Sequence, residues 1–446
     1  GSEPGMIIIK RTDASESWIV YHRSAEGTGT YWSKLELEST GAEYGGTRLW
    51  GAGTGEDHTD STFFVSNAGQ VNASNGTFVA YLFAHNDSGD GEFGPDGDQD
   101  IIKCGSYTGN GSATGPVIDL GFEPQWLLVK RSDAGTDQWL MLDTMRGWPS
   151  GGTVKRLWAN GSDSEGSAAW ASMYLSATGF QPAATDSTIN TNGATYIYMA
   201  IRRGPLAPPE AGTEVFAMDT RASSGTNVEP AYRSPFPVDM AIVDRVINVT
   251  SINRNVARLM GGVYLRTNGA EAEGAYTTVA FDNMNGISDA AFSSPDTNRQ
   301  SYMWKRAPGF FDVVAWTGVA GTAQTINHNL GVVPEMIWTK RRNATSGWIV
   351  YNKTITATNW LALHDDRASG ALSTAWNNTE PTASSFTAGQ TVSATGAPVI
   401  AYLFASLAGV SKVGSVTHSG TTNVDCGFSA GARLVILKRT DATGDW

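Results

Sequence analysis

The densest group of acidic side chains lies in the stretch HNDSGDGEFGPDGDQD, residues 85–100. Calcium ions prefer six to eight oxygen ligands, and aspartates separated by glycines can wrap around such an ion. The stretch does not fit an EF-hand loop, because no glutamate stands at the required twelfth position. We favour a solvated acidic linker, since the corresponding junctions further along carry proline instead. The alternative is a Ca²⁺ site, which would be formed by Asp87, Asp90, Glu92, Asp96, Asp98 and Asp100.

The six histidines form no pattern typical of a metalloprotease, such as HExxH. His364 stands beside Asp365 and Asp366, which would suit an acid–base cluster, although a solvated turn is the simpler interpretation. The chain has no GxSxG elbow and no P-loop. We therefore predict no catalytic residue and expect a protein that is not an enzyme. A polysaccharide depolymerase stays open as an alternative, because its two carboxylates can lie far apart in sequence.

Aromatic residues are plentiful, with 15 Trp and 14 Tyr. An exposed aromatic ring offers an apolar face on which a sugar ring can stack. The simpler interpretation for each Trp is a core residue that anchors a loop. The candidates for a sugar platform are the tryptophans in segments rich in Gly, Ser and Asn, namely Trp148, Trp158, Trp170, Trp360 and Trp376.

One phrase recurs along the chain and indicates an internal repeat. A lysine that follows an apolar run is followed, eight or nine residues later, by a tryptophan. The pairs are Lys10 and Trp18, Lys130 and Trp139, Lys340 and Trp348, and Lys438 and Trp446. The apolar runs at 6–9, 126–129, 336–339 and 434–437 predict central strands buried on both faces. The turns that follow contain Asp13, Asp133, Asn343 and Asp441, and an Arg–Asp contact at the strand end explains the KRxD pattern.

Two further phrases complete each repeat. A closing strand follows an Asn-Gly or Thr-Gly turn in NGTFVAYLFA (75–84), NGATYIYMAI (192–201) and TGAPVIAYLFA (395–405). An opening phrase, of strand, glycine-rich turn and strand, begins at 101, 313 and 411. The predicted organisation is a unit lacking its opening strands (1–85), an Asp/Gly-rich linker (86–100), units at 101–205 and 309–406, a diverged unit at 212–306, and the opening strands of an incomplete unit (411–446).

The expected fold is all-β, a tandem array of jelly-roll or concanavalin-like β-sandwich units of about 100 residues each. No stretch shows the apolar period of a long helix. An unpaired sheet edge invites pairing. We therefore expect residues 411–446, or a neighbouring chain, to supply strands to the unit at 1–85.

Composition excludes several classes of partner. The net charge is −12 and no cluster of Lys and Arg exceeds three residues, which argues against nucleic acid. No apolar run approaches the ~20 residues that span a bilayer, so we expect no membrane insertion.

The longer phrases, among them CGSYTGNGSATGPVIDLGFEPQWLLVKR, MWKRAPGFFDVVAWTG and AYLFASLAGVSKVGS, resemble the repeat units of tail-fibre-like virion proteins of marine tailed bacteriophages, cyanophages especially. The resemblance covers nearly the whole chain, including the diverged unit. It implies a concanavalin-like or jelly-roll sandwich, a virion location and contact with the host surface. Other virion proteins and a host surface polysaccharide are then the expected partners, and a homo-oligomer is compatible with this role. A purely architectural virion subunit is a further alternative.

Overall fold

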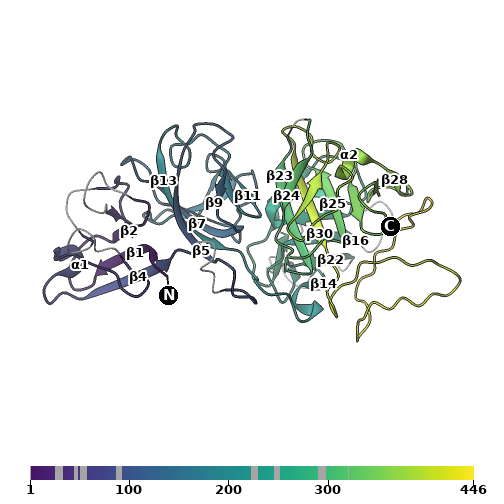
Figure 1. The fold of residues 1–446 in the computed structure, drawn as a ribbon, viewed down its shortest axis with the longest axis horizontal. Helices are drawn as coiled ribbons and strands as arrows, with labels where there is room; N and C mark the ends of the chain where they lie inside the picture. The colour runs from purple at the N-terminus through teal and green to yellow at the C-terminus, as the bar shows by residue number, and fades with distance from the viewer. Residues whose placement is uncertain are drawn as a thin grey trace. The chain divides into compact units, whose positions relative to one another are not determined.

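The computed structural model describes residues 2–25, 34–44, 49–50, 58–86, 93–221, 230–245, 252–289, 298–319 and 321–446. The chain divides into two compact units, Gly1–Gly204 and Pro205–Trp446 (Figure 1). We call residues 1–85, 101–205, 212–306 and 309–406 the first to fourth repeats, and residues 411–446 the C-terminal segment. The first compact unit contains the first two repeats.

The prediction of an all-β chain is confirmed. Within the described ranges the helices are single turns, namely α1 (Gly69–Asn72), α2 (Ser373–Trp376), η1 (Gly212–Glu214) and η2 (Arg258–Met260). None of the helices in the described ranges has the length and apolar character needed to cross a bilayer.

The first repeat forms a four-stranded antiparallel sheet in the order β3-β2-β1-β4. Its strands are β1 (Pro4–Arg11), β2 (Ile19–His22), β3 (Leu35–Glu36) and β4 (Phe78–Ala84). Strand β4 lies at the edge of this sheet, and the side chains of Tyr81 and Leu82 on it are exposed.

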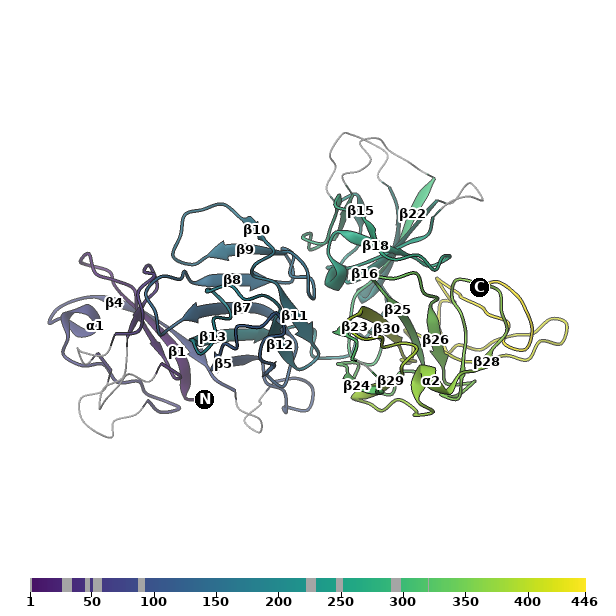
Figure 2. The same ribbon diagram turned by 90° about the horizontal axis from the view of Figure 1, so that it is seen from above.

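The second repeat has a six-stranded sheet, β10-β9-β8-β7-β13-β5, and a three-stranded sheet, β11-β12-β6; Figure 2 shows β10 and β9 at one edge of the larger sheet. The strands are β5 (Ile102–Thr108), β6 (Ile118–Asp119), β7 (Pro124–Arg131), β8 (Leu140–Asp143), β9 (Val154–Trp158), β10 (Gly166–Ala168), β11 (Met173–Ser176), β12 (Gly179–Pro182) and β13 (Thr195–Arg202).

The third repeat has the sheets β14-β22-β16-β17-β18-β19 and β15-β21-β20. Its strands are β14 (Phe216–Thr220), β15 (Tyr232–Arg233), β16 (Met240–Arg245), β17 (Arg254–Ala257), β18 (Val263–Arg266), β19 (Gly274–Ala275), β20 (Val279–Ala280), β21 (Gly286–Asp289) and β22 (Arg299–Trp304). Although its sequence has diverged, its opening, closing and central strands, β14-β22-β16, lie in the same order as β5-β13-β7 of the second repeat.

The fourth repeat has the sheets β23-β30-β25-β26, β24-β29 and β27-β28. Its strands are β23 (Phe311–Thr317), β24 (Gln324–Asn327), β25 (Met336–Arg341), β26 (Ile349–Asn352), β27 (Asn359–Trp360), β28 (Gly370–Ala371), β29 (Ser385–Ala388) and β30 (Pro398–Phe404). The order β23-β30-β25 again places the closing strand between the opening and central strands.

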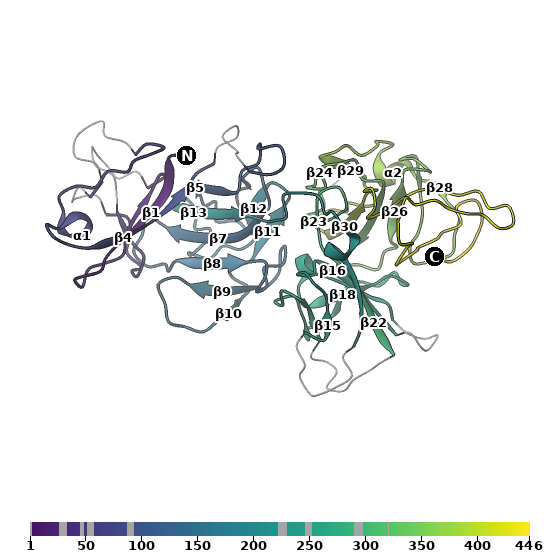
Figure 3. The same ribbon diagram turned by 90° about the horizontal axis from the view of Figure 1, so that it is seen from below.

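The C-terminal segment contains no strand, and Figure 3 shows it as a yellow coil near β28. The predicted strand at 434–437 is therefore wrong, and the side chains of Val435 and Leu437 are exposed. In the other repeats this strand is stabilised by hydrogen bonds to a following strand and to the closing strand, and residues 411–446 contain neither. The expectation that this segment supplies strands to the first repeat is not met either, since it forms none.

The sequences of the central strands are unbroken apolar runs because both faces of their sheets are buried. Alternate side chains of a strand point to opposite faces. In β1, Ile7 and Ile9 pack with Trp50 and Val71 in the core of the first repeat. On the opposite face Met6 and Ile8 join a second core shared with the second repeat, which contributes Cys104, Leu128, Trp139, Ile197 and Met199. The first two repeats are thus held together by a continuous apolar interface.

The expected Arg–Asp contacts are present in the turns after β1 and β7 and in the C-terminal segment. Nε of Arg11, Arg131 and Arg439 lies 2.7–2.8 Å from a carboxylate oxygen of Asp13, Asp133 and Asp441, respectively. Ion pairs exposed in this way contribute little to stability, so their role is to fix the turn.

Candidate functional site

The tryptophan of the repeated phrase binds the preceding repeat. The indole Nε1 of Trp139 donates to the carbonyl oxygen of Glu36 (3.2 Å). Trp348 makes the same bond to Arg266 (2.7 Å), and Trp446 to Ala362 (2.6 Å). Each bond joins one repeat, or the C-terminal segment, to the main chain of the repeat before it.

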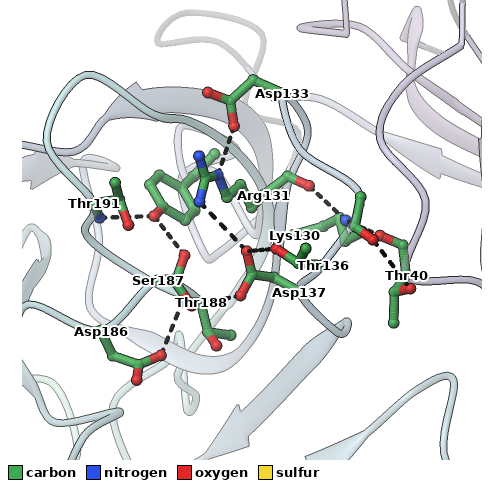
Figure 4. Close-up of polar contacts among 12 residues, drawn as sticks. Thr40, Lys130, Arg131, Asp133, Thr136, Asp137, Asp186, Ser187, Thr188 and Thr191 are labelled. Atoms are coloured by element: carbon green, nitrogen blue, oxygen red, sulfur yellow. Dashed lines mark hydrogen bonds and ion pairs between the residues drawn. The ribbon is translucent and has the colours of Figure 1, made fainter.

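The lysine of the phrase reaches the same neighbour. Nζ of Lys130 donates to the carbonyl oxygen of Thr40 (3.2 Å), as Figure 4 shows. Lys340 donates to Ala270 (3.3 Å) and Lys438 to Asp365 (3.1 Å). These acceptors lie three or four residues after the acceptor of the tryptophan in each case. We call the two residues together the Lys–Trp clamp.

The lysines of the clamp are buried cations that bind mainly carbonyl groups. Lys130 and Lys340 are almost fully buried. Burial disfavours the charged ammonium and lowers the pKa of each lysine to about 8. Their protonation is therefore sensitive to mildly alkaline pH.

A polar network fixes the turn between Lys130 and Trp139. Figure 4 shows Arg131 between Asp133 and Asp137, with Nη1 of Arg131 3.6 Å from Asp137 Oδ2. The hydroxyl of Ser187 donates to Asp137 Oδ1 (2.7 Å). Asp137 is buried, so this network holds the loop that carries Trp139 into the shared core.

Strand register identifies the acceptor of the clamp in every repeat. Glu36 pairs with Ile19, the residue after Trp18, and Arg266 pairs with Arg254. In the second repeat the corresponding pair is Trp158 with Leu140, the residue after Trp139. Trp158 therefore stands at the acceptor position of the second repeat.

The repeat that follows Trp158 does not have the clamp. Register with the closing strand places Asp244 at the position of the lysine. Asn253, which precedes Arg254 of β17, stands at the position of the tryptophan. The third repeat therefore cannot form a Lys–Trp clamp with the second, and the boundary between the compact units falls between these two repeats.

Trp158 belongs to a cluster of one arginine and two tryptophans, which we call the Arg–Trp cluster. The rings of Trp158 and Trp170 stack, with centroids 5.7 Å apart and planes 16° apart. Cζ of Arg156 lies 4.4 Å from the ring centroid of Trp158 and 5.9 Å from that of Trp170. Arg156 and Trp158 share one face of β9, and Trp170 comes from the loop after β10. All three side chains are half-buried.

The other candidate tryptophans are placed differently. Trp148 and Trp376 are fully buried, so the expectation of an exposed ring face is wrong for both. Trp376 packs against Tyr351 and Phe386 in the core of the fourth repeat. Trp360 is partly buried against the same core, and its cation partner Arg367 is already paired with Asp365 (2.7 Å).

The proposed calcium ligands only partly fall within the structure. Asp87, Asp90 and Glu92 lie outside the described residues. Asp96 and Asp98 are exposed and Asp100 is half-buried. Among the residues that the structure describes, no three His, Cys, Asp or Glu side chains gather closely enough to hold a metal ion.

His364 has a structural role that the sequence did not reveal. Its Nδ1 accepts a hydrogen bond from the backbone N–H of Trp348 (3.1 Å), and burial lowers its pKa. The neighbouring Asp365 binds Arg367. Nε2 of His364 also lies 3.4 Å from Asp365 Oδ2, so the ring supports the clamp tryptophan through one nitrogen and faces a carboxylate through the other.

The fold and these contacts define a class of protein: antiparallel β-sandwich-like repeats in tandem, with neighbours joined through main-chain carbonyl groups. The chain belongs to the family described as a domain of unknown function, DUF7483, whose profile matches residues 1–205 and 263–446. The unmatched residues 206–262 include the positions at which the third repeat lacks the clamp. No protein with a curated description matches the chain.

Proposed function

We propose that this protein is a tail-fibre-like structural component of a bacteriophage virion, whose β-sandwich units present binding surfaces to glycans of the host. The observation that carries the proposal is the Lys–Trp clamp, which joins a repeat or segment to the preceding repeat at three places. A protein that must space surfaces along a line needs this kind of repeated contact between neighbours.

The energetics of such an array suit the role. In tandem-repeat proteins each unit is stabilised chiefly by its nearest neighbours. The apolar core shared by the first two repeats follows this pattern. Binding surfaces distributed along the array can each be weak, because simultaneous contacts raise the effective affinity.

The resemblance to phage tail-fibre-like repeats supports the virion location, and with it a concanavalin-like or jelly-roll fold for each unit. Partners of this kind of protein are other virion subunits and a surface polysaccharide. The half-exposed rings of the Arg–Trp cluster offer faces of the kind that saccharides use.

The test is retention of the purified chain on a panel of immobilised bacterial surface polysaccharides, with Ca²⁺ or with a chelator, while released fragments are monitored. The heat-unfolded chain serves as the control. We expect the polysaccharide to retain the chain without releasing fragments. Release of short fragments would instead identify a depolymerase. If the chain bound no member of a panel that includes the host glycan, a purely architectural subunit would be the remaining hypothesis. Retention that requires Ca²⁺ would assign the acidic stretch at 85–100 as an ion site.

A further inference from the structure

We propose that Arg156, Trp158 and Trp170 form a binding site for an acidic saccharide. This inference rests on the proposed function, since it names the chemical class of the host glycan and the place where it binds. It is carried by three observations: the stacking of the side chains, the unpaired charge of the arginine, and the position of the cluster in the repeat.

The geometry of the cluster suits a sugar ring that carries an anion. The two indoles stack side by side and remain half-exposed, so they offer apolar faces to the C–H groups of a saccharide. The guanidinium of Arg156 lies beside both rings, within 5.9 Å of each centroid. A sugar stacked on an indole would place a carboxylate or sulfate within reach of this cation.

No carboxylate among the described residues pairs with the positive charge of Arg156. Its Nε and Nη1 are buried without a hydrogen-bond partner, and no carboxylate in the described part of the chain forms an ion pair with it. The adjacent Lys155, by contrast, lies 3.5 Å from Glu165. The planar guanidinium donates well to carboxylate and sulfate groups, which can accept two parallel hydrogen bonds. An anion from a ligand would therefore supply the partner that the protein does not.

The arginine is held in place before any ligand arrives. Gly166 of β10 pairs with Arg156 of β9. A Cβ atom at Gly166 would lie only 3.1 Å from Cζ and Nη2 of Arg156, so the guanidinium lies directly against the glycine backbone. Strand β10 is the outermost strand of its sheet, as Figure 2 shows, so Arg156 on β9 lies one strand in from the sheet edge. Such preorganisation reduces the entropy lost on binding.

The cluster stands at the acceptor position of the second repeat, where the residues of a clamp are missing. In the first repeat the acceptor position is covered by Trp139 of the next repeat. The third repeat has Asp244 and Asn253 in place of the lysine and the tryptophan, so it lacks the side chains that would form a clamp at Trp158.

The experiment compares binding of the intact chain to dextran, dextran sulfate and alginate by affinity electrophoresis. Dextran and dextran sulfate share a backbone and differ in charge, and alginate tests carboxylates. A protein with a net charge of −12 is repelled by polyanions in general, so binding requires a specific site. We expect binding to at least one polyanion and none to dextran. Arg156→Gln and Trp170→Ala should each weaken that binding about tenfold or more.

Arg156→Lys separates charge from geometry, and we expect it to restore only part of the affinity. Arg367→Gln is the matched control, because Arg367 also lies over a tryptophan but is already paired with Asp365. Thermal unfolding confirms that each variant folds. Unchanged binding in Arg156→Gln, or no binding of the parent chain to either polyanion, would overturn the inference. If the parent chain still binds the bacterial panel in that case, the proposed function stands and only the acidic-saccharide site fails.

Discussion

The acceptor positions of the first and second repeats are equivalent in strand register but have opposite environments. At Glu36 the carbonyl oxygen receives the indole of Trp139, and the surrounding side chains belong to a core shared by two repeats. At Trp158 the position carries a half-exposed ring, stacked on Trp170 and flanked by a cation without a partner. Equivalent positions are thus covered by the next repeat in one copy and carry a half-exposed aromatic cluster in the other.

The difference originates in the following repeat. The second repeat has Lys130 and Trp139 and binds its neighbour; the third has Asp244 and Asn253 at these positions. The third repeat contains a different buried polar group, in which Asp239 lies 3.4 Å from both Arg258 and Arg306.

The largest effect should come from removing a clamp tryptophan. Trp139→Ala empties a fully buried site in the shared core and deletes the bond to Glu36. Loss of a buried Trp costs about 3–5 kcal/mol, and we expect the free energy of unfolding of the first compact unit to fall by that amount in urea titrations. Trp170→Ala, which alters only the half-exposed cluster, should cost about 1 kcal/mol. If the two variants lost the same free energy of unfolding, Trp139 would contribute no more to stability than the half-exposed Trp170, and the proposed difference between the two acceptor positions would be wrong.

The ion cluster of the third repeat should be nearly as sensitive. Asp239→Asn removes the charge that faces two buried arginines, and breaking a buried ion pair from one side costs about 3 kcal/mol or more. Denaturant unfolding of the second compact unit measures this loss. Asp441→Asn, which alters an exposed Arg–Asp contact, is the control and should leave the midpoint unchanged. A midpoint unaffected by Asp239→Asn would mean that the ion cluster contributes little to the stability of the third repeat.

The clamp lysines should make stability depend on alkaline pH. The pKa of Lys130 and Lys340 is about 8 in the folded protein and about 10.5 in an unfolded chain. Between these values the unfolded state binds more protons, so the free energy of unfolding rises with pH. We expect a gain of about 2 kcal/mol per lysine between pH 7.5 and 9.5. Lys130→Met should flatten the rise in the first compact unit, and an identical pH profile for the variant would rule out this lysine as its source.

The smallest effect concerns the glycine beneath Arg156. In Gly166→Ala the new methyl group would meet the flexible end of Arg156 at 3.1 Å, which a small shift can relieve. The stability change should stay within about 0.5 kcal/mol, because the lower entropy of the unfolded chain offsets the contact. Binding of polyanions should nevertheless weaken several-fold. Gly204→Ala, where a Cβ atom has no neighbour within 4 Å, is the matched control and should bind normally.

Sequence patterns predicted the all-β class and placed the central strands of the first, second and fourth repeats correctly, since β1, β7 and β25 contain the apolar runs. They also revealed the recurrence of Lys and Trp, but not its purpose. Both residues bind main-chain carbonyl groups. The carbonyl groups that accept the tryptophan bond belong to Glu36, Arg266 and Ala362, which have no side-chain type in common. A contact of this kind leaves no signature in sequence.

The candidate site was predictable only in part. Trp158 and Trp170 were chosen together with Trp148 and Trp376 because all four lie in polar segments, yet two of the four fill cores. Composition around a residue does not report which way its side chain points. Arg156 was missed, although its spacing of two residues from Trp158 would place both on one face of a strand. What the sequence could not show is that no carboxylate among the described residues forms an ion pair with Arg156.

The sheet of the first repeat is buried on both faces, and we infer from this how much of the chain must fold together. The sheet of the first repeat encloses one core with its own loops and a second with its neighbour. Opening either repeat would expose apolar surface of both, so the pair should unfold cooperatively. Tension applied along such a chain would therefore be resisted by two cores at once. In the first compact unit the mechanical module is therefore a pair of repeats, and the first repeat cut from the chain would lose its second core.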